Sequence, residues 1–219
     1  MLGVVRTNSG RNASTTFLIV DAQSVKNTDT AEQIGYEAGK KVSGIKRHIA
    51  VDTQGLPHAI AVTTANVTDR KGALEAMKKH TTWLSKVTHV LADGGYTGQP
   101  FADGIQEILG ATVTIAKRNE LHTFSVIPQR WVVERSFAWL EKCRRLWKNC
   151  ERQLNTSLQF VTCNYSAATQ LAGLDRQQLR GAALPACCAL VCVGCRGRSG
   201  WCRSCRRRRW CGNIPIFSV

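Results

Sequence analysis

The sequence has few acidic residues, no long apolar run and no apolar leader. Acidic residues number 15 against 30 Lys and Arg, which gives a net charge of +15 and predicts a polyanionic partner, nucleic acid first. The longest nearly apolar stretch, Pro185 to Cys195, is much shorter than the roughly 20 residues of a membrane span. The N-terminal region holds only the short apolar block at 17–20. We therefore expect neither membrane insertion nor secretion.

Cysteine is scarce in the first part of the chain, where only Cys143, Cys150 and Cys163 precede residue 174. Without a secretory signal, we interpret these three as reduced, partly buried thiols instead of a disulfide framework. The chain also lacks a GxxxxGK[ST] phosphate-binding loop, so we expect no nucleotide cofactor. A length of 219 residues with 43% apolar content suits one compact domain.

The hydrophobic pattern predicts strands first and then alternating helices and strands. Strands are predicted at 15–21, in both arms of a hairpin over 44–65 with its turn at 52–55, at 89–93 and at 111–116. Helices are predicted at 69–80, 99–109 and 127–149, and a polar loop at 35–44. This order indicates an α/β fold with a mixed sheet flanked by helices, because the later strands need helical crossovers to join in parallel.

Three acidic residues stand at informative places in this pattern. Asp21 and Asp93 end predicted strands, and Glu134 lies in the most strongly patterned helix. Carboxylates gathered at strand ends would suit Mg²⁺, and a pair of such ions clamps both the attacking and the leaving oxygens of a phosphodiester. Each acid alone is more often a turn residue or a helix cap. From composition, both interpretations stay open.

Four segments resemble, in order and spacing, the DDE transposases of bacterial insertion sequences. They are LIVDAQSVKNTD, GKKVSGIKRHIAVDTQGLPHAIAVTTANVTDRKG, VLADGGYTGQPF and PQRWVVERSFAWLEKCRRLWKNCERQLNTS. The narrower similarity is to the insertion-sequence-five family within the IS-four-like superfamily. It runs from about residue 17 to residue 174 and covers most of the chain.

The resemblance implies a ribonuclease-H-like fold in which Asp21, Asp93 and Glu134 are the catalytic residues and hold two Mg²⁺ (or Mn²⁺) ions. It implies that water cuts the transposon end and frees a 3′-hydroxyl, which then attacks target DNA. It further implies a homo-oligomer when active, with transposon ends and target DNA as partners. The expected location is the bacterial cytoplasm, on the nucleoid.

The family signature around the glutamate is only partly present. It runs Tyr, two residues, Arg, three residues, Glu, six residues, Lys. Arg130 and Glu134 fit this signature, whereas Ile127 replaces the Tyr and Glu141 the Lys, with Lys142 one position late. The departure leaves the phosphate-contacting role of the lysine open and does not touch the carboxylate assignment.

From the sequence alone, basic residues in two of these segments are predicted to form a solvent-exposed edge. The resemblance implies that this edge faces DNA. The expected DNA-binding residues are Lys40, Lys41, Lys46, Arg47, Arg130, Lys142, Arg144, Arg145 and Lys148. Two aromatic residues beside them, Trp131 and Trp139, are interpreted as core residues.

Four other polar residues have simpler expected roles than the three acids. Asp52 precedes the hairpin turn and is interpreted as a turn residue. Asp69 begins a helix, where it is expected to act as a cap or else to approach the site. His48 and His58 lie on hairpin strands, where neutral packing or surface roles are expected.

The sequence divides into a leader at 1–15, a catalytic domain at 16–174 and a Cys- and Arg-rich tail at 175–219. Cys192, Cys195, Cys202 and Cys205 form two CxxC pairs typical of zinc sites. The alternative, which we favour, is translation out of frame, with a disordered tail that binds no zinc. The resemblance implies a helical DNA-recognition region before the first Asp, and only 20 residues precede Asp21 here. We therefore expect an N-terminally truncated catalytic part; the alternatives are an inactive DNA-binding remnant or a nuclease of the same fold.

Overall fold

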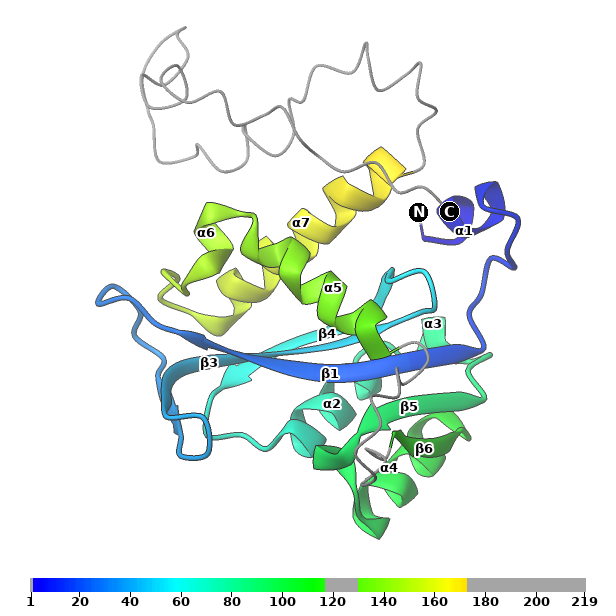
Figure 1. The fold of residues 1–219 in the computed structure, drawn as a ribbon, viewed down its shortest axis with the longest axis horizontal. Helices are drawn as coiled ribbons and strands as arrows, with labels where there is room; N and C mark the ends of the chain where they lie inside the picture. The colour runs from blue at the N-terminus through cyan, green and yellow to red at the C-terminus, as the bar shows by residue number, and fades with distance from the viewer. Residues whose placement is uncertain (1, 117–129, 173–219) are drawn as a thin grey trace, which may run out of the picture. The chain divides into compact units, whose positions relative to one another are not determined.

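A computed structural model describes residues 2–116 and 130–172 and shows a sheet with helices on both faces (Figure 1). The strands are β1 (Phe17–Lys26), β2 (Gly35–Glu37), β3 (Val42–Val51), β4 (Pro57–Thr64), β5 (His89–Asp93) and β6 (Thr112–Ala116). The helices are α1 (Leu2–Asn8), α2 (Asp69–Lys78), α3 (Thr81–Leu84), α4 (Gln99–Leu109), α5 (Arg130–Glu141), α6 (Arg144–Trp147) and α7 (Leu154–Ala172), with a 3-10 turn η1 (Gly94–Tyr96).

The six strands form one mixed sheet in the order β2-β3-β1-β5-β6, with β4 also paired to β3. β3 runs antiparallel to β1, β2 and β4, whereas β5 runs parallel to β1 and β6 runs parallel to β5. The parallel pairing of β1, β5 and β6 follows from the helical crossovers. α2 and α3 before β5, and α4 before β6, return the chain to the end of the sheet at which β1 begins. The predicted mixed sheet flanked by helices is confirmed.

β1 is longer than predicted, because it continues beyond Asp21 to Lys26. Its antiparallel pairing with β3 extends as far as Lys26 opposite Gly44, whereas its parallel pairing with β5 stops at Val20 opposite Ala92. Asp21 therefore stands where the parallel half of the sheet ends. The predicted loop at 35–44 also contributes the short strand β2, which pairs with the start of β3.

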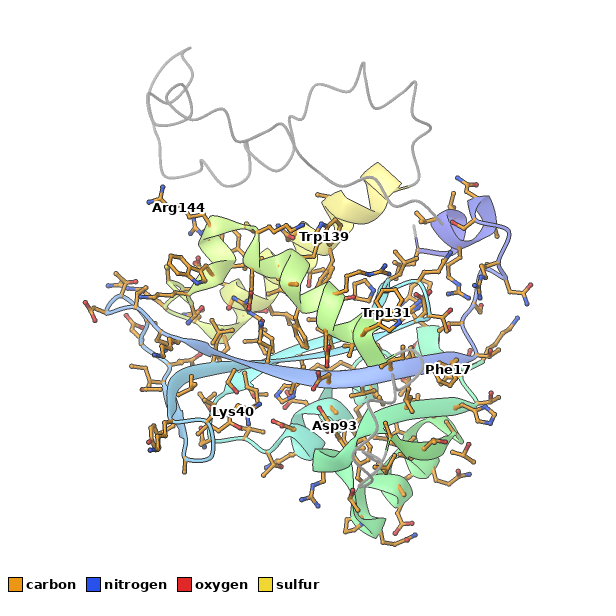
Figure 2. All side chains as sticks on the ribbon, viewed as in Figure 1. Phe17, Lys40, Asp93, Trp131, Trp139 and Arg144 are labelled. Carbon is orange, nitrogen blue, oxygen red and sulfur yellow. The ribbon has the colours of Figure 1, made fainter. Side chains whose placement is uncertain are left out.

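The helix predicted over 127–149 is shorter in the structure. α5 ends at Glu141, and the extended backbone of Cys143 separates α5 from α6. α5 and α7 cover one face of the sheet, where Val133, Phe137 and Leu140 pack against strand residues. Trp139 is half-buried against this core, as predicted. The core assignment of Trp131 is wrong, because its side chain is 50% exposed and carries the Arg135 guanidinium 4.5 Å above its ring (Figure 2).

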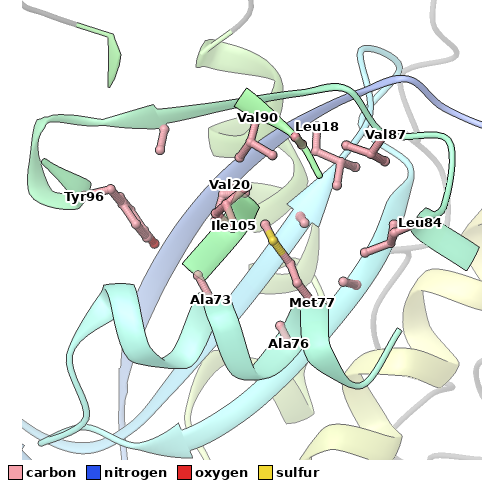
Figure 3. Close-up of a cluster of buried hydrophobic side chains, with 14 of the residues drawn as sticks. Leu18, Val20, Ala73, Ala76, Met77, Leu84, Val87, Val90, Tyr96 and Ile105 are labelled. Carbon is pink, nitrogen blue, oxygen red and sulfur yellow. The ribbon is translucent and has the colours of Figure 1, made fainter. Parts of the chain in front are cut away.

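α2, α3 and α4 cover the opposite face and bury Met77, Leu84 and Ile105 against Leu18 and Val90 (Figure 3). α2 lies so close to β3 that a side chain at Gly72 would not fit, since a Cβ there would stand 2.1 Å from the His48 ring. The cap of α2 is Thr68, whose hydroxyl accepts a hydrogen bond from the Lys71 N–H, so the capping role predicted for Asp69 is wrong.

The three early cysteines are free thiols. Their predicted partial burial is confirmed for Cys143 and is wrong for Cys150 and Cys163, which are exposed. Across residues 2–116 and 130–172, the helices are too short or too polar to cross a lipid bilayer. The predictions for Ile127, for the tail at 175–219 and for its CxxC pairs lie outside the described residues.

Candidate active site

The parallel pairing of β1 and β5 brings two of the predicted acids together. One step beyond the last pair, Val20 opposite Ala92, the register sets Asp21 beside Asp93 on strands about 4.8 Å apart. Val20 and Ala92 belong to the core beneath α2, so the alternation of side chains turns both aspartates toward α5. Asp21 and Asp93 are half-buried and line one hollow together with Val133 of α5.

Local hydrogen bonds hold both carboxylates at the edge of the sheet. Asp21 Oδ1 accepts a hydrogen bond from the Ala22 N–H at 2.7 Å. Asp93 Oδ1 accepts one from the Gly95 N–H at 2.9 Å and so caps the turn η1 directly after β5. Gly94 and Gly95 in this turn are exposed, so the chain leaves the sheet directly after Asp93.

Glu134 lies on the exposed side of α5, directly after the residue that lines the hollow. Within 2–116 and 130–172, no three Asp, Glu, His or Cys side chains gather closely enough to hold a metal ion. The structure therefore brings Asp21 and Asp93 together and does not join Glu134 to them in a three-ligand group. The pair itself fits a divalent cation of the Mg²⁺ type, which prefers carboxylate oxygens.

Tyr96 is a residue near this edge to which the sequence assigned no role. It lies in the turn η1, and its ring packs against Phe101 with centroids 5.2 Å apart. Burial raises the pKa of Tyr96 well above its ordinary value, and the negative charges of Asp21, Asp69 and Asp93 raise it further. The quoted ADGGY segment contains this tyrosine, and its position three residues after Asp93 was the available signal.

Lys46 belongs to the buried interior and not to a solvated edge, which corrects the prediction. Its side chain is 4% exposed, and its Nζ lies 2.8 Å from Asp69 Oδ1 and 3.2 Å from Glu37 Oε1. Nζ also donates a hydrogen bond to the Val67 carbonyl at 3.0 Å. Two carboxylates and one carbonyl therefore hold this ammonium inside the protein, away from DNA phosphates.

Arg47 is also buried, at 1% exposure, so its assignment to a DNA-facing edge is likewise wrong. Burial lowers the pKa of Arg47 to about 10, although Tyr165, Cys143 and Glu141 oppose the shift. Consecutive residues of a strand point to opposite faces, and here helices cover both faces of β3. Lys46 and Arg47 are therefore buried on opposite sides of the same sheet.

His48 has the neutral packing role that was predicted. Burial lowers its pKa to about 4, and its Nε2 hydrogen-bonds the Thr63 hydroxyl at 2.9 Å.

The other basic residues predicted to face DNA are mostly at the surface. Lys40 and Lys41 are exposed in the turn between β2 and β3. Arg145 is half-buried, with its Nε 2.8 Å from Glu151 Oε1 and its guanidinium 4.2 Å above the Phe160 ring. The remaining exposed ones are Lys142, Arg144 and Lys148. The side chain of Arg130 lies outside the described part.

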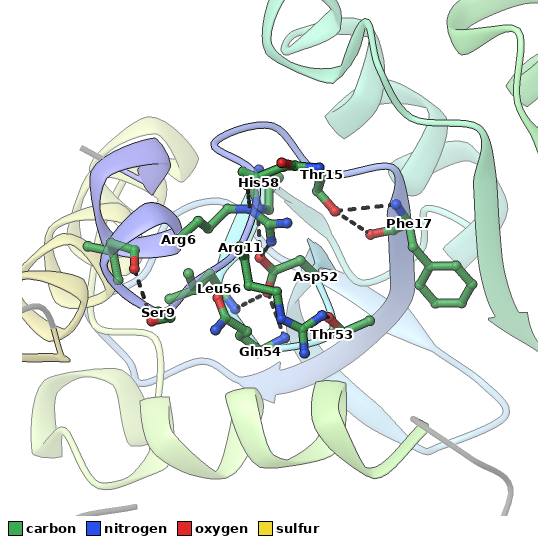
Figure 4. A network of polar contacts seen from close by, with 12 residues as sticks. Arg6, Ser9, Arg11, Thr15, Phe17, Asp52, Thr53, Gln54, Leu56 and His58 are labelled. Atoms are coloured by element: carbon green, nitrogen blue, oxygen red, sulfur yellow. Dashed lines mark hydrogen bonds and ion pairs between the residues drawn. The ribbon is translucent and has the colours of Figure 1, made fainter. Parts of the chain in front are cut away.

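Asp52 has the turn role that was predicted, in a fully buried setting (Figure 4). Its Oδ1 accepts hydrogen bonds from the N–H groups of Gln54 at 2.9 Å and Leu56 at 3.0 Å. Its Oδ2 pairs with Arg6 of α1 and lies 3.2 Å from His58 Nε2. Burial alone would raise the pKa of Asp52, but His58, the Leu56 N–H and Arg6 lower it below its ordinary value.

Comparisons with known proteins agree with this description. A family profile described as "Transposase DDE domain" matches residues 12–168. A Burkholderia cepacia protein named "Putative transposase for insertion sequence element IS402" is 33% identical over 127 residues, which make up 54% of this chain. The match spans 59% of that relative's length. The narrower insertion-sequence-five assignment stays a prediction.

Two solved structures show weaker likeness. The catalytic core domain of BIV integrase has a TM-score of 0.43 at 13% identity, covering 68% of this chain and 81% of that chain. The piggyBac transposase synaptic complex with hairpin DNA has a TM-score of 0.46 at 12% identity, covering 78% of this chain and 49% of that chain. By its sheet order and by the family profile over residues 12–168, this chain has a ribonuclease-H-like α/β fold and belongs to the transposase DDE domain family.

Proposed function

We propose that this chain is the catalytic domain of a DNA transposase that cleaves the end of an insertion sequence and joins it to target DNA. The observation that supports it most is the alignment of Asp21 with Asp93 at the end of two parallel strands. The alignment falls inside the segment matched by the transposase DDE family, whose members generally use divalent metal ions.

Asp21, Asp93 and Glu134 are the residues we propose to hold Mg²⁺ (or Mn²⁺), two ions in the loaded site. When bound, the metal supplies Lewis acidity to a phosphate oxygen and lowers the pKa of coordinated water. The protein's own part is to orient: the Ala22 and Gly95 N–H groups fix the two aspartates. In the proposed reaction, water cuts the phosphodiester and leaves a 3′-hydroxyl, which then displaces a 3′-oxygen in target DNA.

We propose two exposed basic clusters as the DNA surface. The first is the turn at Lys40 and Lys41, and the second is formed by Lys142, Arg144 and Lys148 around the α5–α6 junction. Lys46 and Arg47 are excluded from this surface because they are buried. The active form is proposed to be a homo-oligomer bound to transposon ends, on the nucleoid in the bacterial cytoplasm.

A supercoiled-plasmid assay with transposon-end duplexes and Mg²⁺ tests this function. We expect joined products from the wild type and none from Asp21→Asn. The matched control is Asp103→Asn, which removes an exposed carboxylate on α4 and should join ends normally. Nicks without joining would instead indicate a nuclease, and no metal-dependent product at all would indicate an inactive DNA-binding remnant.

A further inference from the structure

Away from the aspartate pair, Arg47 of β3 is an unusual group because it is a charged side chain buried in the protein. Its side chain is among the largest fully buried ones, and Nε, Nη1 and Nη2 find no hydrogen-bond acceptor among the described residues. A buried guanidinium is costly to the fold unless a carboxylate lies near. The cost of burying Arg47 therefore suggests that this arginine has a specific role.

Two neighbours connect Arg47 to the helix that carries Glu134. Gln23 is its cross-strand partner on β1, and the Oε1 of Gln23 is also buried without a donor among the described residues. The amide Nε2 of Gln23 donates a hydrogen bond to Glu141 Oε1 at 2.7 Å. The charge of Glu141 also acts on Arg47, where it opposes the effect of burial on the pKa. Arg47, Gln23 and Glu141 thus link β3, β1 and the end of α5.

The positions of these residues relate directly to the proposed catalytic acids. Gln23 follows Asp21 by two residues, so both side chains point to the same face of β1. Glu141 follows Glu134 by seven residues, close to two helical turns, so both lie on the same side of α5. β1 and α5 run in broadly the same direction (Figure 1). The hydrogen bond between Gln23 and the exposed Glu141 therefore ties the end of α5, which packs on the sheet through Val133 and Phe137, to the strand that carries Asp21.

We propose that Arg47, Gln23 and Glu141 are positioning residues that set α5 against β1 and so keep Glu134 on the side of the helix that serves the Asp21–Asp93 pair, a role that rests on the proposed function. Glu141 occupies the place where the family signature has a lysine. In this chain that place anchors the helix to the sheet. Lys142, which is exposed one position later, stays available for DNA.

Single variants of the anchor test this role through the split between kcat and KM. Glu141→Ala and Gln23→Ala should lower kcat for end cleavage by on the order of ten- to a hundredfold, because a misplaced catalytic group is costly. KM for DNA should not change. Glu141→Gln keeps an oxygen that can accept from Gln23 and should recover most of kcat. The matched control is Glu107→Ala, an exposed glutamate on α4. Glu141→Ala with wild-type kcat would overturn the proposal.

A second readout does not depend on activity. Hydrogen exchange should become faster in the last turn of α5 in Glu141→Ala and Gln23→Ala, with α2 unchanged, and the double variant should equal either single one because the two residues share one contact. Unchanged exchange in α5 would overturn the anchor even if the wild type is active. If the wild type cleaves no DNA, the proposed function fails, while faster exchange in α5 would still establish the contact.

Discussion

Asp52 and the pair Asp21–Asp93 are carboxylates on neighbouring strands or turns of one sheet, yet the protein treats them in opposite ways. Asp52 is fully buried, and both of its oxygens are used by Gln54, Leu56, Arg6 and His58. Asp21 and Asp93 are half-buried, accept local backbone hydrogen bonds and line a hollow that Val133 of α5 also lines.

The difference shows that a carboxylate at a strand end is not by itself a functional signal. Asp52 follows β3 at a hairpin turn, so its neighbours in sequence supply the hydrogen bonds that it needs. Asp21 and Asp93 lie where parallel pairing ends, and parallel strands bring residues distant in sequence to one edge. The first arrangement stabilises the fold, and the second leaves acids in position to act on a ligand.

The largest expected effect separates these carboxylates by activity. Asp93→Asn should lower metal-dependent cleavage by about a thousandfold or more, because losing a metal ligand removes roughly 4 kcal/mol of transition-state stabilisation. Its urea unfolding should stay within about 0.5 kcal/mol of wild type, as for other partly exposed positions. Cleavage and unfolding are measured on the same preparations. If Asp93→Asn cleaves normally, the two kinds of carboxylate are not distinguished by function.

Asp52→Asn should show the reverse pattern. It leaves the buried Arg6 cation without a counter-charge, which should lower the free energy of unfolding by about 3 kcal/mol. Urea unfolding at neutral pH measures the loss, with Asp103→Asn as the exposed control. A change no greater than that of the control would mean that the Arg6–Asp52 pair contributes little to the fold.

The pH dependence of stability should come in part from Asp52. Its pKa is lower in the folded than in the unfolded protein, so its contribution is complete above the unfolded pKa and is lost as the pH falls through the folded pKa. Unfolding free energies of the wild type should therefore fall on acidification more steeply than those of Asp52→Asn. If the unfolding free energies of the two proteins fell equally steeply on acidification, the lowered pKa of Asp52 would not contribute to stability.

The smallest expected effect concerns the exposed lysines. Lys40→Ala with Lys41→Ala should weaken DNA binding modestly and reduce the slope of log affinity against log salt by up to about 2. Fluorescence anisotropy at several salt concentrations measures both. Arg47→Met should leave the slope unchanged because Arg47 is buried. A slope reduced by Arg47→Met would show that the buried arginine reaches DNA after all.

The sequence predicted well those elements whose boundaries are set locally. α4 was placed at its observed bounds and β5 at its observed end, because Gly110 and the Gly94-Gly95 turn stop them. The acids Asp21 and Asp93 could be paired only through the family resemblance, since no local pattern reports which strands are neighbours.

The error at Lys46 and Arg47 has a tertiary cause, which is that helices cover both faces of the sheet. A basic run such as Lys46-Arg47 looks solvated in the sequence, but α2 and α5 bury the two faces of β3. Helical periodicity across 127–149 could not reveal the break at Cys143, which lies where α5 meets Gln23 and Arg47. Trp131 is predicted as a core residue, yet it lies at the surface beneath the Arg135 guanidinium.

The most direct test of the aspartate pair as a metal site is iron-mediated cleavage of the polypeptide. Fe²⁺ replaces Mg²⁺ in the full chain, and ascorbate with hydrogen peroxide generates radicals that cut the backbone close to the bound ion. We expect cuts near residues 21 and 93 that excess Mg²⁺ suppresses, that Asp93→Asn abolishes and that Asp52→Asn retains. Cuts that persist in Asp93→Asn, or that gather around residue 52, would contradict the assignment of the site to Asp21 and Asp93.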